Sequence, residues 1–252
     1  MSLHPAQLRA RHFLLPKDGA GLEECEDAVG VNVEAGRFAL ADGATEAFDA
    51  GSWARALASG WVGREETPLA VGEFREWAAE EGRRFERGWA GRELPWYAEA
   101  KARAGSFATF VGLALDAGGG GVRWRALALG DACLIQRRGS AVVRAWPLAD
   151  PAAFNSAPAL LPSREAALAG ALARASTAEG EARAGDCFLL LSDAAAAWFL
   201  TLSRAGDPAL EEFDSLLAAA ENEALAALLR AERAAGRIKD DDVAAVRVEV
   251  DF

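Results

Sequence analysis

Short apolar runs bounded by turn residues predict β-strands in three stretches of the chain. The runs at 28–33 and 37–41 are separated by Glu-Ala-Gly, a pattern typical of a hairpin. Further strands are predicted at 107–115, 122–129, 132–137 and 141–145. Tight turns join them, and the glycine run at 118–121 is the first of these turns. The last two predicted strands are a buried one at 186–191 and one at 243–250, where apolar and polar residues alternate.

Helical periodicity separates these groups of strands. The apolar spacing at 52–62 and 68–89 predicts two helices, the second with Trp and Phe residues along one side. Another helix is predicted to begin at Asp193, and 207–235 is mostly helical and ends near Gly236. Strands, then helices, then strands again predict an α+β fold in which packed sheets have helices outside them.

The length of 252 residues fits one large domain, and we expect residues 1–252 to form it. Residues 1–20 are interpreted as an N-terminal arm. The stretch 150–180 carries several prolines and mixed content, and we expect it to be an excursion on the same domain and not a linker.

The formal net charge of −11 narrows the possible partners. An acidic chain is a poor ligand for nucleic acid, whose phosphates require a basic face, and equally poor for an anionic membrane surface. No segment is apolar enough to span a bilayer, and residues 1–11 lack the apolar core of a signal peptide. We therefore expect a cytoplasmic protein with neither nucleic acid nor membrane as a partner.

Cysteine and histidine usage limits the chemistry. The cysteines Cys25, Cys133 and Cys187 are far apart and odd in number, which indicates reduced thiols. The two histidines, His4 and His12, lie at the N-terminus, and there is no Cys-x-x-Cys, so a zinc site is not expected. Acid–base or Lewis-acid chemistry then depends on Asp, Glu, Lys or a bound metal.

Acidic residues recur where predicted strands begin or end. Glu26 and Asp27 precede the first strand, Asp42 follows the second, Asp193 follows the strand at 186–191, and 240–242 is a run of three Asp before the last strand. Taken singly, each is a common solvated turn residue. If these strand ends meet at one edge, however, they make an all-oxygen site suited to Mg²⁺ or Mn²⁺.

Six short motifs in a fixed order resemble the protein phosphatase 2C family, over about residues 25–250. They are Cys25-Glu26-Asp27-Ala28, Ala41-Asp42-Gly43-Ala44, Gly105-Ser106-Phe107-Ala108-Thr109, Leu129-Gly130-Asp131, Leu191-Ser192-Asp193 and Asp241-Asp242-Val243. The second motif and the Asp-Ala of the fifth are most similar to the bacterial branch, as is the stretch from Leu94-Pro95-Trp96-Tyr97 to Lys101 and Gly105.

This resemblance implies a four-layer α-β-β-α sandwich with two packed, mainly antiparallel sheets flanked by helices. It also implies two Mn²⁺ or Mg²⁺ ions and a third near Asp131. The metal ligands would be Glu26, Asp42, Gly43 through its carbonyl, Asp193, Asp241 and, for the third ion, Asp131. Asp42 and Asp193 would be the catalytic residues. The implied activity is hydrolysis of phosphoserine and phosphothreonine in proteins by a water that two metals activate.

The main departure from the family concerns the substrate phosphate. The family usually has a phosphate-clamping arginine four residues before the first-motif Glu, where this chain has Leu22, followed by Glu23 and Glu24. Lys17 or Arg11 are the candidate substitutes. A second hypothesis is therefore a catalytically weak or inactive regulatory or binding module with this fold. A third is an unrelated acidic α+β protein that gains no stability from Mn²⁺.

Overall fold

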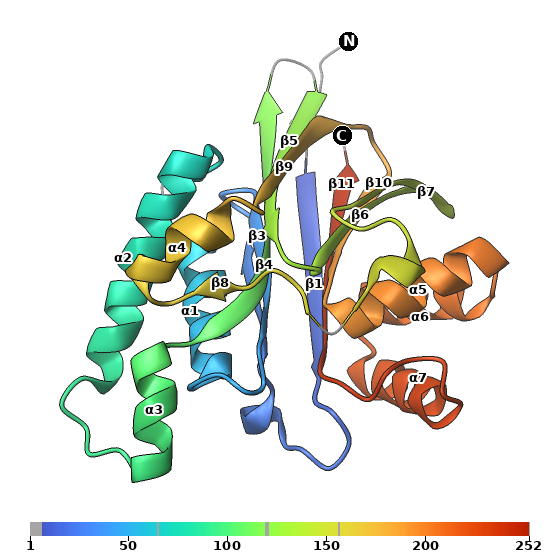
Figure 1. The fold of residues 1–252 in the computed structure, drawn as a ribbon. Coiled ribbons are helices and arrows are strands. Elements are labelled where there is room, and N and C mark those ends of the chain that lie inside the picture. The colour runs from blue at the N-terminus through green and yellow to red at the C-terminus, as the bar shows by residue number, and fades with distance from the viewer. Residues whose placement is uncertain (1–6, 65, 119–120, 156, 252) are drawn as a thin grey trace.

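Two antiparallel sheets form the centre of the molecule (Figure 1). The computed structural model describes residues 7–64, 66–118, 121–155 and 157–251, so His4 and the middle of the glycine run at 118–121 lie outside the described residues. The first sheet has the strand order β1 (Gln7–Leu15), β11 (Val243–Asp251), β10 (Asp186–Leu191), β6 (Cys133–Arg138) and β7 (Ala141–Trp146). The second has the order β2 (Asp27–Asn32), β3 (Arg37–Gly43), β4 (Phe107–Gly118), β5 (Gly121–Leu129) and β9 (Ser176–Ala182), and β8 (Leu161–Pro162) pairs with β4.

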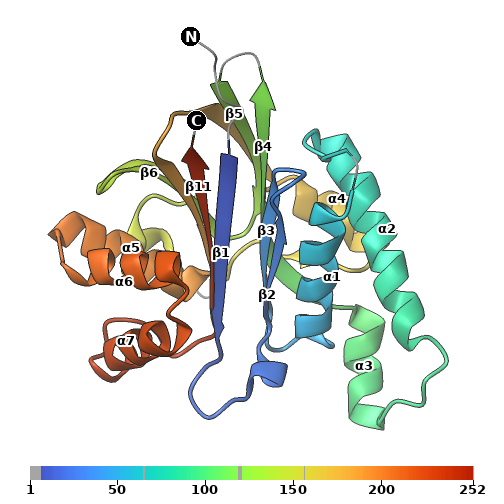
Figure 2. The same ribbon diagram turned by 180° about the vertical axis from the view of Figure 1, so that it is seen from behind.

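Helices cover the outer faces of both sheets. Those beside the second sheet are α1 (Ala50–Val62), α2 (Val71–Trp89), α3 (Trp96–Ala104) and α4 (Glu165–Leu172). Those beside the first sheet are α5 (Asp193–Ala205), α6 (Ala209–Ala219) and α7 (Asn222–Ala234). Figures 1 and 2 show the two groups on opposite sides of the paired sheets, so the layers run α-β-β-α. The fold predicted from the sequence is confirmed.

Strand β10 shows why the sequence folds into layers. Phe188 and Leu190 point into the core between the two sheets, whereas Leu189 and Leu191 point toward the helices. All four are fully buried. A strand that is covered on both faces needs an uninterrupted apolar run, which is what residues 188–191 provide.

The alternation along β11 has a different cause from the one that the pattern suggests. Its polar positions do not all face solvent: Arg247 is 8% exposed and lies on the helix-facing side. Its Nε donates to Oδ1 of Asp214 in α6 at 2.9 Å. A buried arginine paired in this way ties the sheet to the helix layer.

Three segments differ from the sequence prediction. Residues 7–15 of the supposed N-terminal arm form the edge strand β1, whose polar residues hid its strand pattern, as happens at a sheet edge. The excursion at 150–180 contains β8, α4 and most of β9, and in β9 only Ala178 and Ala182 are buried. The predicted helix at 207–235 is two helices, because the backbone turns at Ala220 with φ of 58°.

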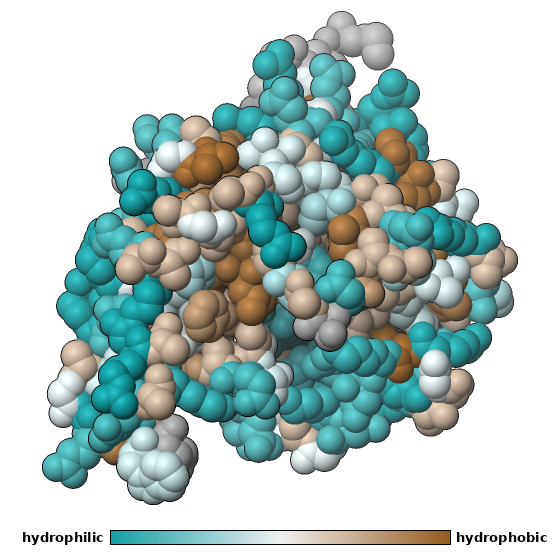
Figure 3. Space-filling model, in the orientation of Figure 1, coloured by the Kyte–Doolittle hydropathy of each residue, from teal (hydrophilic) through white to brown (hydrophobic). Residues whose placement is uncertain are grey.

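The outer surface carries the polar residues that the buried layers exclude. Hydrophilic residues cover much of the face shown in Figure 3. Within the described residues, the longest and most apolar helices still fall short of what crossing a membrane requires.

Candidate metal-dependent hydrolase site

The acidic residues singled out from the sequence gather at one edge of the two sheets. We call this group the acidic edge; it consists of Glu26, Asp27, Asp42, Asp131, Asp193, Asp241 and Asp242. The start of β2 and the end of β3 bring residues from the second sheet, and the end of β10 and the start of β11 bring residues from the first. The segment between β5 and β6 crosses from one sheet to the other and carries Asp131.

Strand register brings the first two aspartates together. In the antiparallel β2–β3 pair, Asp27 is directly opposite Asp42, and on the other side of β3 Asp42 is opposite Thr109 of β4. Asp27 is 3% exposed and Asp42 is partly buried. Two carboxylates directly opposite each other repel, so the pairing of β2 with β3 must hold them in place against this repulsion.

Asp242 joins the two sheets at this edge. Its Oδ1 accepts a hydrogen bond of 2.8 Å from the backbone N–H of Lys17, after β1. Its Oδ2 accepts one of 2.7 Å from the backbone N–H of Glu26, before β2. Asp242 is therefore a structural residue, and its neighbour Asp241, with a side chain 32% exposed, is the one left facing the acidic edge.

The β10–α5 junction positions Asp193. The backbone N–H of Ser192 donates to the carbonyl of Ala244 at 3.1 Å, and the Ser192 hydroxyl accepts from the Ala244 N–H at 2.9 Å. This double link fixes the end of β10 against β11. Asp193 is the first residue of α5, where a carboxylate is favoured by the helix dipole.

Two glycines allow the backbone to approach closely here. A Cβ on Gly43 would lie 2.8 Å from the Ala50 carbonyl and 2.9 Å from that of Glu26. Gly130 has φ of 105°, and a Cβ there would lie 2.6 Å from that of Thr109. Larger residues at either position would push apart the strand ends that carry Asp42 and Asp131.

The electrostatics of the site show that these carboxylates sense one another. Burial, followed by the charges of Asp27, Asp193, Asp131 and Asp241, raises the pKa of Asp42 well above its usual range. Burial and then Asp193 raise the pKa of Asp131 to about 6. The effect of the Asp193 charge on Asp42 places the two in one electrostatic site, although Asp42 lies in the second sheet and Asp193 follows a strand of the first.

Asp27 has the same character. Burial and then Asp242 raise its pKa well above the usual range, against the lowering effect of a hydrogen bond with Ser192. Asp27 lies in the first of the six motifs but is not among the site residues predicted from the sequence. Its place in the site depends on the strand register: Asp27 lies within β2 and opposite Asp42, a long-range contact that no local sequence signal encodes.

Several buried oxygen atoms at the acidic edge have no hydrogen-bond partner. They include Oδ2 of Asp27, Oδ1 of Asp131 and Oγ1 of the adjacent Thr109. Buried polar atoms are normally satisfied, so unpaired ones mark a place where water or an ion binds. All are oxygen atoms, the ligand type that Mg²⁺ and Mn²⁺ prefer.

Two lysines lie beside these acids. Nζ of Lys17 is 3.5 Å from Oε2 of Glu26. Nζ of Lys239 is 2.5 Å from Oδ2 of Asp241 and 3.8 Å from Oδ2 of Asp193. Within the described residues, no three His, Cys, Asp or Glu side chains are arranged to hold a metal ion as they stand. The donor atoms therefore fit a divalent cation in kind, while lysines neutralise part of their charge.

The two residues predicted to bind substrate phosphate are placed differently. Lys17 lies at the acidic edge, where burial would lower its pKa but Glu26 and Asp242 raise it above the usual value. Arg11 lies in the middle of β1, opposite Arg247, and lines a surface pocket with Arg9 and Glu249. Arg11 is therefore not beside the acidic edge.

The Leu22 position adds no positive charge to the site. Leu22 is 60% exposed and begins the short 3₁₀ helix η1 (Leu22–Glu24). Glu24 folds back so that its Oε2 accepts a 2.8 Å hydrogen bond from the backbone N–H of Gly21. The segment before Glu26 is thus apolar and acidic where the family usually has an arginine.

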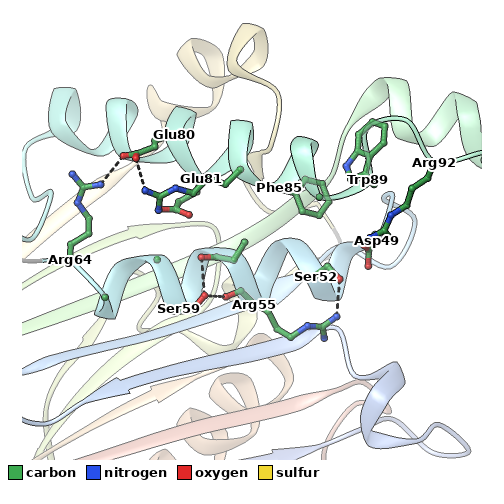
Figure 4. A pocket seen from close by; sticks show the side chains of 15 residues that line it. Asp49, Ser52, Arg55, Ser59, Arg64, Glu80, Glu81, Phe85, Trp89 and Arg92 are labelled. Atoms are coloured by element: carbon green, nitrogen blue, oxygen red, sulfur yellow. Dashed lines mark hydrogen bonds and ion pairs between the residues drawn. The ribbon is translucent and has the colours of Figure 1, made fainter.

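A surface groove between α1 and α2 is a separate feature (Figure 4). Its volume is about 890 Å³. Several of its charges pair with one another: Glu80 pairs with Arg64 at 3.2 Å and with Arg84 at 2.6 Å, and Arg84 also pairs with the buried Glu81 at 2.9 Å. The groove lacks the converging, unpaired carboxylate oxygens of the acidic edge, so the acidic edge remains the candidate site.

Solved structures of phosphatases share this fold. The catalytic domain of the serine/threonine protein phosphatase PstP, in complex with two manganese ions, superposes with a TM-score of 0.63 at 16% identity, covering 98% of this chain and 100% of that one. The photosystem II phosphatase PBCP gives 0.60 at 15% identity, covering 96% and 98%. PppA of Pseudomonas aeruginosa, described as a regulatory component of a type VI secretion system, gives 0.55 at 18% identity, covering 97% and 99%.

These likenesses define the class of fold. The chain has the protein phosphatase 2C fold over nearly its whole length. No protein-family model matches the sequence, and no curated protein matches it either. The fold-level resemblance inferred from the six motifs is confirmed.

Proposed function

We propose that the chain is a divalent-metal-dependent phosphomonoesterase that acts on phosphoserine and phosphothreonine in proteins. One observation carries the proposal. Carboxylates from strand ends of both sheets converge at the acidic edge, where Asp193 raises the pKa of Asp42, Asp241 raises the pKa of Asp193, and buried oxygens lack partners. Such an arrangement is costly unless a cation relieves it.

The proposed ligands are the residues that the family resemblance implies. Glu26, Asp42, the Gly43 carbonyl, Asp193 and Asp241 would hold two divalent ions, and Asp131 would serve a third. Bound Mn²⁺ or Mg²⁺ would supply charge neutralisation for a phosphate dianion and lower the pKa of a water molecule. The absence of histidine beyond residue 12 is compatible with such chemistry.

The chain's own residues supply the framework. Asp242 and Ser192 hold the ends of β1, β2, β10 and β11 together, so that the acidic side chains keep their positions. Lys17 is the cation best placed to contact a substrate phosphate among the two residues predicted from the sequence. Phosphoproteins as substrates are supported by the fold, since PstP is described as a serine/threonine protein phosphatase.

A second candidate is a binding or regulatory module with weak or no turnover. The exposed Leu22, followed by Glu23 and Glu24, favours it, because two extra negative charges before Glu26 repel an approaching phosphate. PppA is a structural neighbour whose description names a regulatory role. Both candidates use the same acidic edge, so one experiment separates them.

The test is Mn²⁺-dependent hydrolysis of p-nitrophenyl phosphate and of a phosphothreonine peptide. We expect Asp42→Asn and Asp193→Asn to lose at least about 100-fold in kcat/KM, because several kcal/mol of transition-state charge stabilisation disappear. The matched control is Asp116→Asn, since Asp116 is an exposed residue at the other end of β4, paired with Arg125 at 2.9 Å.

The outcomes divide cleanly. Wild-type turnover that depends on Mn²⁺ and survives only in the Asp116→Asn variant supports the enzyme. Mn²⁺ binding and phosphopeptide binding without turnover support the regulatory module. Turnover that Asp42→Asn and Asp193→Asn leave intact would remove the acidic edge from the reaction.

A further inference from the structure

Lysine is rare in this chain and is found in a particular setting. Of the 27 lysines and arginines, three are lysine: Lys17, Lys101 and Lys239. Lys17 and Lys239 contact members of the acidic edge. Lys101 is 3.3 Å from Glu46, in the loop that follows Gly43. Arginine carries almost all other positive charge, so lysine at the acidic edge stands out as a difference in chemistry.

Arg233, close to the same edge, has a structural role. The side chain of Arg233 is 2% exposed, and its guanidinium donates to the carbonyl of Pro16 at 2.8 Å and to that of Asp241. These contacts to backbone are permanent parts of the fold, because the planar guanidinium fits several acceptors at once. Arg233 thus anchors the segment before β11 from within.

Lys239 is exposed by comparison. Its side chain is 64% exposed, and the ion pairs that the described residues make with it go to the carboxylates of Asp193 and Asp241. An ammonium group is a compact charge on a flexible stem and does not grip a carboxylate with a rigid fork. Exposed pairs of this kind contribute little to stability, so exchanging this partner costs little.

The position of the ammonium is the important point. It lies between two carboxylates that come from different strand ends, after β10 and before β11. A single positive charge there only partly offsets the acidic edge, in which Asp27 and Asp131 keep unpaired buried oxygens. A divalent cation binding Asp193 and Asp241 would neutralise more charge and would displace the ammonium.

We propose that Lys239 is a displaceable counterion: it neutralises Asp193 and Asp241 when no metal is bound, gives way to a divalent cation, and then binds the substrate's phosphate. This inference rests on the proposed function. Because Lys239 is two residues from Asp241, its released ammonium stays at the mouth of the site. It then supplies positive charge that the Leu22–Glu24 segment lacks.

The first test measures Mn²⁺ binding without any substrate. Isothermal titration of chelator-treated protein compares the wild type with Lys239→Met, Lys239→Arg and the control Lys101→Met. We expect Lys239→Met to bind Mn²⁺ about two- to fivefold more tightly, the range that loss of an exposed ion pair permits. Lys239→Arg is expected to bind more weakly than wild type, because a guanidinium holds two carboxylates better. Lys101→Met should match the wild type.

The second test addresses the phosphate. With Mn²⁺ saturating, inorganic phosphate should inhibit Lys239→Met about fivefold less well than wild type, because one charged hydrogen bond to the anion is lost. Equal inhibition constants would refute the phosphate role. Mn²⁺ affinity in Lys239→Met that equals or falls below that of the wild type would refute the counterion role.

The failures of the two proposals can be told apart. If the wild type hydrolyses p-nitrophenyl phosphate with Mn²⁺ and Lys239→Met gains no affinity, only the inference about Lys239 fails. If neither the wild type nor Lys239→Met binds Mn²⁺, the proposed function and the inference both fail. Binding by Lys239→Met alone would overturn the inference, because it would show that Lys239 blocks the cation and does not give way to it.

Discussion

Two aspartates with opposite surroundings lie at the ends of β10: the buried Asp186 at its start and the partly buried Asp193 just after its last residue. Asp186, at its start, is fully buried, and its carboxylate accepts hydrogen bonds from Arg138 at 2.7 and 2.9 Å, from Gln136 at 2.8 Å and from the N–H of Arg183 at 3.0 Å. Burial alone would raise the pKa of Asp186, but these hydrogen bonds lower it below its usual value. This acid is satisfied by the protein.

At the acidic edge, beyond the other end of β10, the carboxylates have few such donors. There burial and neighbouring acids raise the pKa of Asp193, and only the Lys239 charge and a local backbone hydrogen bond oppose them. Asp27 and Asp131 keep buried oxygens without partners. Burial of an acid therefore does not by itself identify a functional site. A cluster of acids whose buried oxygens lack hydrogen-bond partners is the stronger indication.

The largest expected effect is the loss of stability when Asp186, at the start of β10, is replaced. Asp186→Ala should lower the free energy of unfolding by about 2–4 kcal/mol, because it leaves several donors unpaired, including the buried amide of Gln136, and removes the partner of the half-exposed Arg138. Mn²⁺-dependent turnover of the folded protein should stay within about twofold of wild type, since Asp186 lies outside the acidic edge. Urea unfolding and p-nitrophenyl phosphate assays measure the two quantities.

The control for this prediction is Asp116→Ala. Its partner Arg125 and Asp116 itself are both about half exposed, so the expected change is below about 0.5 kcal/mol. Equal destabilisation by the two variants would show that the hydrogen bonds of Asp186 contribute no more than a surface pair, and the contrast between the ends of β10 would lose its basis.

The sequence predicted the layers better than the site. Short runs such as 188–191 are apolar at every position, as strands buried on both faces are, so the order of elements could be predicted. Edge strand β1 was not predicted, because Arg9 and Arg11 interrupt the apolar pattern of the segment. The break at Ala220 has no glycine or proline to announce it.

The candidate site was predicted by resemblance and not by pattern. Periodicity places Asp42 and Asp193 at strand ends, but only the order of strands within the sheets places those ends at one edge. Asp27 requires the β2–β3 register, and Lys239 requires the packing of the segment before β11 against Asp193. Contacts of this kind are long-range, and no local signal encodes them.

The second-largest expected effect is stabilisation of the folded protein by Mn²⁺ at the acidic edge. At a Mn²⁺ concentration of about 100 times Kd, binding to the native state should add about 2.7 kcal/mol of stability, or roughly 5–10 °C in Tm. Differential scanning fluorimetry with and without chelator measures it. Asp193→Asn should lose most of this shift and Asp186→Asn should keep it, since only Asp193 belongs to the acidic edge.

An absence of any shift in the wild type would favour the third hypothesis from the sequence, an acidic α+β protein without a metal site. A shift that Asp193→Asn retains in full would instead place the metal elsewhere. Asp116→Asn serves as the charge-matched control, because it removes the same formal charge from an exposed position.

The smallest expected effect concerns pH in the metal-free protein. The pKa of Asp131 is raised to about 6 in the folded state, mainly by burial and by Asp193. An acid with a raised pKa binds its proton more tightly in the folded state, so stability is highest below its unfolded pKa, near 4, and falls as the pH rises through about 6. With chelator present, unfolding by urea at pH 5 and pH 8 should show this loss, of roughly 1–2 kcal/mol from Asp131.

Asp131→Asn isolates this contribution, because an amide cannot ionise. The variant should lose less stability than the wild type between pH 5 and pH 8. Asp186→Asn should not flatten the curve, since the pKa of Asp186 is lowered and its stabilising contribution is complete by about pH 5. If the wild type and Asp131→Asn lose stability in parallel, Asp131 is not repelled by its neighbours, and the acidic edge is less strained than its unpaired oxygens indicate. If only the wild type declines, the unsatisfied end of β10 destabilises the metal-free fold in the way that a cation-binding site requires.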